Sequence, residues 1–128
     1  MDERERREAG MQMRRRVLGD EHVNRAEAAT NELDVEFQDL ITRYAWGEIW
    51  TRSGLPPNTR SLLTIALMVA LNRGEELRLH LRAAANNGVS AEEIQEVLMH
   101  CAIYCGVPAA NAAFHAAKEV LGDGGKPR

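Results

Sequence analysis

Histidines and carboxylates at helical spacing are the side chains in this 128-residue chain best suited to acid–base chemistry. Glu76 and His80 lie four positions apart, so on a helix they share one face. A carboxylate beside an imidazole is a candidate acid–base pair, because the carboxylate orients the ring and the ring transfers the proton. The competing interpretation is a surface pair that contributes only about 0.3 kcal/mol to stability.

The same spacing recurs twice further along the chain. Glu96, His100 and Tyr104 form one polar stripe, and Asn111 and His115 form another. Three successive predicted helices therefore each present a histidine, and a pocket needs polar groups that converge from several elements. His100, Tyr104 and His115 are thus candidates for a pocket wall or an alternative acid. The alternative is a solvated face or a satisfied polar network.

Arg60 is the candidate anchor for an anionic ligand. It falls in the first turn of the most apolar segment, and a guanidinium meets a carboxylate with two parallel hydrogen bonds. An arginine that snorkels from a helix end is the alternative interpretation. Trp46, four residues before Trp50, is a candidate pocket residue, although aromatic residues at that spacing also serve in cores and interfaces.

Neither a metal site nor a cofactor site is predicted. The four histidines lack H-E-x-x-H spacing, and no C-x-x-C accompanies them. Cys101 and Cys105 are four positions apart on one predicted helix, a poor geometry for a disulfide. We interpret them as reduced cysteines that pack as small apolar residues.

Length and composition predict one soluble, cytoplasmic domain spanning residues 1–128. The net charge is −3 and the pI about 5.8, which provides no general attraction for nucleic acid or an anionic membrane. Residues 1–16 are too charged for a secretory signal. The longest apolar run, residues 62–71, is roughly half of the ~20 residues that a membrane-spanning helix requires.

The hydrophobic pattern predicts an all-α fold, a compact bundle of six to seven helices. Ser90 with Glu93 is a capping box that starts one helix, and Pro108 suits the first turn of the last helix. The other helices are expected at residues 2–18, 21–32, 34–50, 59–73 and 75–87. Residues 10–121 are expected to be ordered and residues 122–128 to form a flexible tail.

Two segments predict a homo-oligomer. Residues 59–73 are apolar on nearly all faces, which suits burial by this chain and by a partner subunit. The charged N-terminal helix is expected on the surface or against a neighbouring subunit. Its run Arg14, Arg15 and Arg16 either clamps a carboxylate from such a neighbour or balances Glu8 and Asp20.

Four stretches together resemble the 4-carboxymuconolactone decarboxylase family over residues 10–121. They are RRRVLGDEHVNRA at 14–26, YAWGEIWTRSGL at 44–55, TRSLLTIALMVALNRGEELRLHLRAAANNGVSAEEI at 59–94 and HCAIYCGVPAANAAFH at 100–115. The family belongs to the alkylhydroperoxidase D-like superfamily, whose peroxidases carry C-x-x-C followed four residues later by histidine. Here RGEELRLH retains only His80, with Arg73 and Glu76 at the cysteine positions, which disfavours peroxidase chemistry.

The resemblance implies conversion of 4-carboxymuconolactone, a lactone dicarboxylate, to 3-oxoadipate enol-lactone and carbon dioxide. This is a step of protocatechuate breakdown by the β-ketoadipate route, and it implies no cofactor and a homo-oligomer, expected as a hexamer. We expect Arg60 to anchor a carboxylate and His80, oriented by Glu76, to stabilise the enolate or deliver the proton. Alternatives are a same-fold enzyme for another lactone, a peroxidase-like relative, or a non-catalytic helical binding protein.

Overall fold

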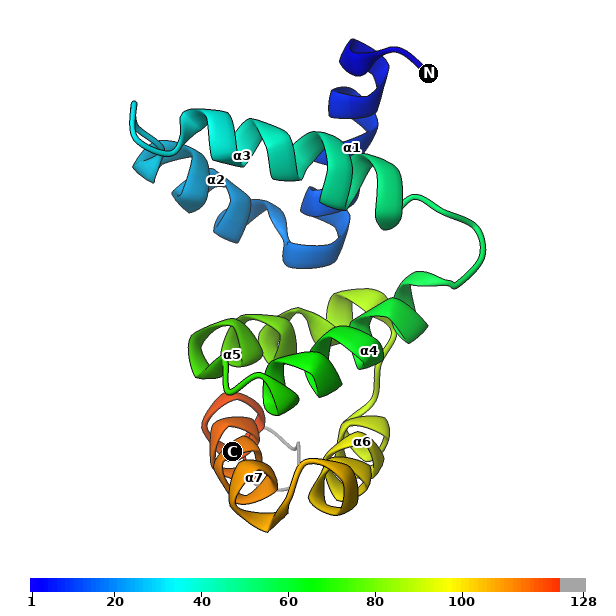
Figure 1. Ribbon diagram of the computed structural model, residues 1–128, viewed down its shortest axis with the longest axis vertical. Helices are drawn as coiled ribbons and strands as arrows, with labels where there is room; N and C mark the ends of the chain where they lie inside the picture. Colours follow the sequence, from blue (N-terminus) through cyan, green and yellow to red (C-terminus); the bar gives the residue numbers. More distant parts are fainter. Residues whose placement is uncertain (123–128) are drawn as a thin grey trace. The chain divides into compact units, whose positions relative to one another are not determined.

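Helices account for all the regular structure in the residues that the computed structural model describes, 1–122 (Figure 1). The chain divides into two compact units. Residues 1–57 contain α1 (Glu3–Leu18), α2 (Asp20–Ala29), α3 (Val35–Ile41) and the π-helix η1 (Thr42–Ile49). The second unit, from Asn58, contains α4 (Pro57–Ala70), α5 (Gly74–Ala83), the 3₁₀-helix η2 (Ala84–Asn87), α6 (Ala91–Tyr104) and α7 (Val107–Leu121).

The predicted all-α fold class is confirmed. Residues 123–128, most of the predicted flexible tail, lie outside the described residues. Among residues 1–122, no helix is both long and apolar enough to cross a membrane.

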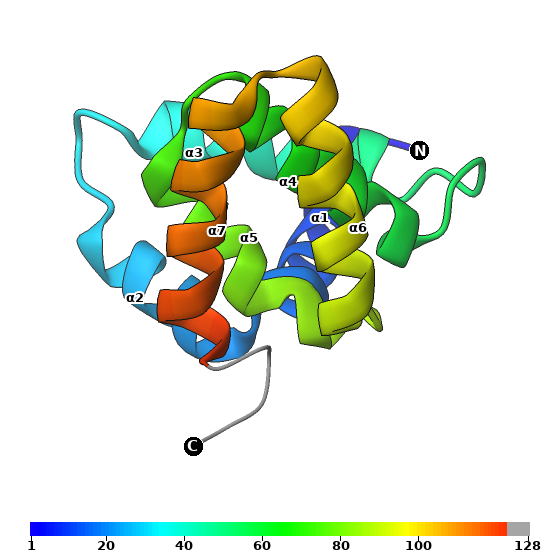
Figure 2. The same ribbon diagram turned by 90° about the horizontal axis from the view of Figure 1, so that it is seen from below.

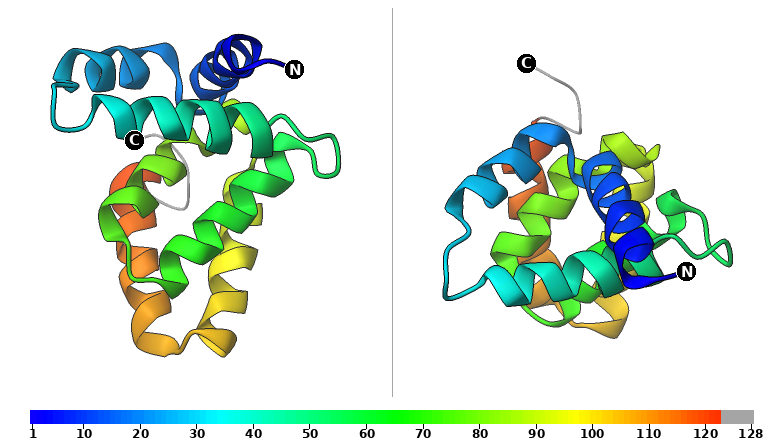
Figure 3. Two further views of the ribbon diagram at one scale, coloured as in Figure 1. Left: turned by 45° about the horizontal axis from the view of Figure 1, so that its top comes forward. Right: turned by 90° about the horizontal axis from the view of Figure 1, so that it is seen from above.

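Two glycines bring α1 and η1 into direct backbone contact (Figure 3). A Cβ atom added at Gly10 would lie 1.9 Å from the carbonyl oxygen of Thr42, and one added at Gly47 would lie 2.3 Å from that of Arg6. No other residue type fits at these separations, because real Cβ contacts are longer than 3.0 Å. The chain therefore has glycine on both sides of this helix crossing.

Ion pairs with η1 and α3 explain why α1 carries charges nearly all round. Arg43 of η1 binds Glu3 at 2.9 Å, and Arg6 of α1 binds Glu48. The guanidinium groups of Arg6 and Arg43 also lie 5.3 and 5.2 Å from the ring centroid of Tyr44. Charged side chains of α1 thus pair with a second helix of its own unit.

The predicted single helix over residues 34–50 is half α-helix and half π-helix. In η1 the backbone N–H of Trp50 donates to the carbonyl of Ala45, five residues earlier, at 3.0 Å. Thr42, Trp46 and Gly47 of η1 are buried. Phe37 and Leu40 of α3 and Tyr44 of η1, which the 3.6-residue period would place on one inward apolar face, are more than 40% exposed.

The core of the second unit lies among α4, α5, α6 and α7. Figure 2 shows α7 beside both α5 and α6. Alanines on the inner face of α7 permit this close packing, and leucines and isoleucines from the other helices fill the space against them. The largest of these buried side chains are Ile65 of α4, Leu81 of α5 and Leu98 of α6.

Local signals set the helix boundaries in this unit. The Ser90 hydroxyl accepts from the N–H of Glu93 at 3.1 Å, and the Glu93 carboxylate accepts from the N–H of Ser90 at 3.0 Å. The predicted capping box is confirmed. Gly106, with φ of 98°, separates α6 from α7 in a backbone region that favours glycine.

Helix α4, which its composition predicts to be buried by this chain and by a partner subunit together, buries one face within this chain. Ser61, Ile65 and Val69 face the core, but Leu63, Leu67 and Leu71 are 48%, 56% and 59% exposed. These three leucines recur every fourth residue and so lie along one helix face. Within this chain, therefore, only one face of α4 is buried.

Candidate functional site

The predicted catalytic pair lies on α5, a short amphipathic helix. Leu77 and Leu81 bury one face of α5 in the core. Glu76 is exposed in the first turn, and His80 is half-buried one turn later. The two side chains thus lie on the same helix at the spacing that the sequence indicated, with His80 the closer of the two to the core.

An ion pair between α5 and α7 fixes the helix that carries His80. The Nε and Nη2 atoms of Arg78 donate to the two carboxylate oxygens of Glu119 at 2.8 and 3.3 Å. The hydrogen bonds and positive charge of Arg78 lower the pKa of Glu119, and the nearby His115 lowers it further. This bidentate geometry restricts the rotation of α5 against α7.

His115 therefore belongs to the same polar edge as this ion pair. It is exposed and precedes Glu119 by one turn of α7. Asn111, one turn earlier, is also exposed. The predicted polar stripe of α7 thus faces out of the core, while the alanines of that helix face into it.

His100 and Tyr104 form the second predicted cluster, on α6. Their ring centroids lie 4.8 Å apart and the ring planes are tilted by 31°. Both side chains are exposed, and Tyr104 is 77% exposed. The i, i+4 spacing has therefore produced a ring–ring contact on the outer face of α6.

The two remaining candidates lie in different units. Arg60 is half-buried in the first turn of α4, and its carbonyl accepts a hydrogen bond of 2.8 Å from the hydroxyl of Thr64. Trp46 is buried in η1, and its ring centroid lies 5.1 Å from that of Trp50. Arg60 thus shares a unit with α5, α6 and α7, which carry His80, His100 and His115, whereas Trp46 belongs to the π-helix of the first unit.

The cysteines pack as the sequence analysis predicted. Both thiols are free, Cys101 is buried in the core, and Cys105 is half-buried at the end of α6. Burial raises the pKa of the Cys101 thiol, and its contact with Cys105 raises it further. A raised pKa keeps the thiol protonated and so disfavours nucleophilic chemistry. Within residues 1–122, no group of three or more histidine, cysteine or acidic side chains is arranged to hold a metal ion.

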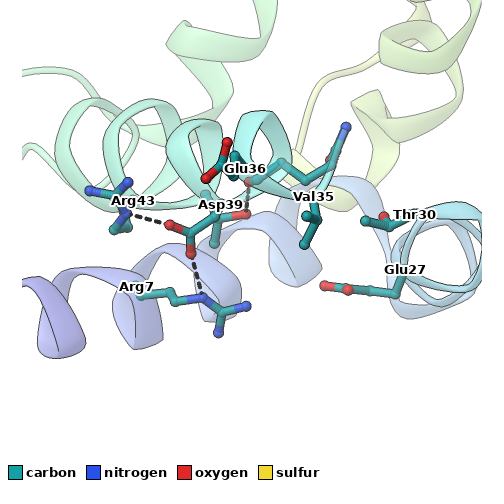
Figure 4. A pocket seen from close by; sticks show the side chains of 9 residues that line it. Arg7, Glu27, Thr30, Val35, Glu36, Asp39 and Arg43 are labelled. Atoms are coloured by element: carbon teal, nitrogen blue, oxygen red, sulfur yellow. Dashed lines mark hydrogen bonds and ion pairs between the residues drawn. The ribbon is translucent and has the colours of Figure 1, made fainter. Parts of the chain in front are cut away.

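Sequence reasoning missed a polar cavity of about 400 Å³ in the first unit (Figure 4). Asp39 of α3 lies on its wall and binds both Arg7 of α1 at 2.9 Å and Arg43 of η1 at 2.8 Å. These two cations lower the pKa of Asp39. The i, i+4 spacing of Asp39 and Arg43 was visible in the sequence, but the contribution of Arg7, 32 residues away, was not.

The chain belongs to the carboxymuconolactone decarboxylase family, whose sequence model matches residues 36–119. The match covers η1 and all the helices that carry the predicted site residues.

Individual relatives extend this similarity to nearly the whole chain. The 4-carboxymuconolactone decarboxylase of Acinetobacter baylyi is 50% identical over 123 residues, covering 96% of this chain and 92% of that protein. The nitrosuccinic acid decarboxylase npaB of Metarhizium robertsii is 40% identical, covering 95% of this chain and 87% of its own length. A 4-carboxymuconolactone decarboxylase sequence from Pseudomonas putida is 54% identical over 48 residues, covering 38% of this chain and all of that sequence.

Proposed function

We propose that this protein decarboxylates 4-carboxymuconolactone to 3-oxoadipate enol-lactone, releasing carbon dioxide. The observation that carries the proposal is the 50% identity over 96% of the chain to a protein of that name. The reaction belongs to protocatechuate breakdown by the β-ketoadipate route. As a small-molecule metabolic enzyme, the protein is assigned to the cytoplasm.

The substrate's own structure makes the reaction feasible without a cofactor. The carboxylate that leaves is attached to the ring carbon next to the carbon–carbon double bond. When its bond breaks, the electron pair moves through that double bond onto the lactone carbonyl, forming a dienolate. A proton added to the carbon alpha to the carbonyl then gives the enol-lactone. The protein must bind the carboxylates, stabilise the dienolate oxygen and supply this proton.

We assign these tasks to residues of the second unit. His80 donates to the dienolate oxygen or delivers the proton, because it is half-buried on a helix that the Arg78–Glu119 ion pair fixes. Glu76, one turn earlier, orients the imidazole. Arg60 anchors a carboxylate of the substrate through its guanidinium.

The other candidates have supporting roles in this proposal. His100 with Tyr104 and, on α7, His115 contribute to the pocket wall or serve as an alternative acid. The stacked rings of His100 and Tyr104 are exposed and can therefore meet a ligand. Trp46, in the first unit, is retained as a candidate substrate-binding residue because its indole ring suits apolar contact with a ligand.

We also propose that the working enzyme is a homo-oligomer, a hexamer. The exposed leucines Leu63 and Leu67 of α4, with Leu71 directly after its end, support this assembly. Contiguous exposed apolar surface is uncommon on monomeric proteins and marks interaction sites. Subunit contacts at such a face would bury it and give the all-round burial that the composition of α4 predicts.

A second substrate is favoured by one observation, the 40% identity to a nitrosuccinic acid decarboxylase. Both substrates lose a carboxylate as carbon dioxide, so the two proposals share the reaction class. The higher identity to the 4-carboxymuconolactone enzyme puts that substrate first.

The test is a side-by-side assay of purified protein with freshly generated 4-carboxymuconolactone and with nitrosuccinic acid, each with and without a chelator. Carbon dioxide release and loss of the lactone's ultraviolet absorbance are followed together. We expect chelator-insensitive turnover of the lactone at a kcat/KM well above that for nitrosuccinic acid. The reverse preference would favour the second substrate, and no carbon dioxide from either would favour a binding protein.

A further inference from the structure

Arg14 of α1 is a buried cation whose positive charge and hydrogen-bond donors are only partly satisfied by the surrounding protein. Its side chain is 6% exposed, and its Nη2 donates a hydrogen bond of 3.3 Å to Oε1 of Gln38, a neutral amide. The Nε of Arg14 is enclosed and has no hydrogen-bond acceptor. Across residues 1–122, none of the ion pairs includes Arg14.

The neighbours of Arg14 in the sequence do not share this environment. Arg15 donates to Asp20 at 3.0 Å and to Asn24 at 2.9 Å, and Arg16 is exposed to solvent. The two interpretations of the arginine run therefore apply to different residues. Arg15 balances Asp20, whereas Arg14 forms no ion pair among the described residues and receives only partial compensation from the charge of Glu27.

Burial without a counter-ion is unfavourable for a guanidinium. Burial lowers the pKa of Arg14, the charge of Glu27 raises it in part, and Arg15 lowers it. A cation in this position is usually retained because an anion pairs with it in the functional state. A carboxylate is well suited, since its two oxygens match two adjacent guanidinium N–H groups.

The polar cavity of the first unit lies next to Arg14, because Gln38 both lines the cavity and accepts its hydrogen bond. The volume of about 400 Å³ is within the range of small-molecule sites. Arg7 and Arg43 on the wall are already paired with Asp39, as Figure 4 shows. They are therefore not the main source of attraction for an anion.

Two exposed carboxylates, Glu27 and Glu36, also line this cavity and repel anions. An anion is consequently favoured at the wall formed by Gln38, the lining residue that Arg14 contacts. The side-chain NH₂ of Gln38 is an additional donor there, since its amide oxygen already accepts from Arg14.

We propose that the first unit binds a small organic carboxylate at the Gln38 wall of this cavity, with Arg14 as its counter-ion. The site consists only of residues 1–57 and does not depend on the decarboxylase proposal.

The test compares thermal unfolding of the full chain in succinate with unfolding in sodium chloride of equal ionic strength. A ligand that binds only the folded protein raises Tm, and at about 100 times its Kd we expect a rise of roughly 10 °C. Arg14→Met, which keeps the apolar stem and removes the charge, should abolish this rise. The matched control Arg16→Met, an exposed arginine of the same run, should retain it. An equal rise in both variants, or none in the unaltered protein, would overturn the proposal.

A second measurement uses the unaltered protein and so does not depend on whether a variant folds. In the full chain with ¹⁵N-labelled arginine, succinate should shift the Nε–Hε signal of Arg14 while the signal of Arg16 stays in place. The same titration at two protein concentrations identifies the source of the carboxylate. If an acidic side chain of a second copy occupied the site, the Arg14 signal would move with protein concentration and not with succinate, contradicting the proposal.

Discussion

Arg78 on α5 and Glu119 on α7 are joined by two hydrogen bonds, Nε to Oε2 at 2.8 Å and Nη2 to Oε1 at 3.3 Å. They are 41 residues apart in the sequence, and the pair lies one helix turn or less from both His80 and His115. A bidentate contact fixes orientation as well as distance, so it limits how α5 can rotate against α7.

This ion pair predicts an acid-dependent loss of stability. The folded-state pKa of Glu119 lies below its ordinary value of 4.5, so the pair contributes fully above about pH 4.5. The contribution is lost as the pH falls through the lowered folded-state pKa, because the carboxylate becomes protonated. The Tm difference between the unaltered protein and Glu119→Gln should therefore be constant from pH 5.5 to 7 and shrink below about pH 4.5. A difference independent of pH would contradict this account.

The contact between α1 and η1 predicts that replacing Gly10 by alanine destabilises the protein. Replacing Gly10 by alanine ordinarily stabilises a helix by about 1 kcal/mol. Here the new Cβ would collide with the carbonyl of Thr42, so we expect Gly10→Ala to lower the free energy of unfolding by about 2 kcal/mol. Gly54→Ala is the control, since nothing lies within 4 Å of its added Cβ. Urea denaturation measures the free energy of unfolding of both variants. A stabilised Gly10→Ala protein would contradict the close packing of α1 against η1.

Removal of the proposed acid predicts loss of turnover with retained structure. We expect His80→Ala to lower kcat by about 10²- to 10⁴-fold, and Glu76→Gln to lower it less, since Glu76 only orients the ring. His22→Ala is the matched control, because His22 of α2 is also half-buried but has no role in the proposal. Circular dichroism and sizing check the fold and assembly. A His80→Ala protein that unfolds or misassembles would instead favour a structural role for this histidine.

The proposed anchor predicts an effect on substrate binding. Arg60→Gln removes the charge that meets a substrate carboxylate, so KM should rise by about 10- to 100-fold with a smaller change in kcat. Arg82→Gln, at an exposed arginine of α5, should leave both constants unchanged. Steady-state kinetics would exclude the anchor role if the two variants behaved alike.

Local signals account for what the sequence predicted well. The capping box at Ser90 and the shared helix face of His100 and Tyr104 involve residues at most four positions apart, so their spacing alone defines them. The all-α fold follows from the same short-range periodicity.

Long-range contacts account for what the sequence could not predict. The contact of Gly10 with Thr42 and the ion pair of Arg78 with Glu119 depend on which helices meet, which the helical period does not specify. The π-helix was missed because its wider turn breaks the 3.6-residue period used to assign inward-facing side chains.

The most direct test of the decarboxylase account is carbon dioxide release from 4-carboxymuconolactone labelled with ¹³C in the ring-bound carboxyl group, with metal-free protein. The account predicts one labelled carbon dioxide for each lactone consumed by the unaltered protein, and release slowed by about 10²-fold or more with folded His80→Ala. Label retained in the product, or equal release by the two proteins, would contradict it.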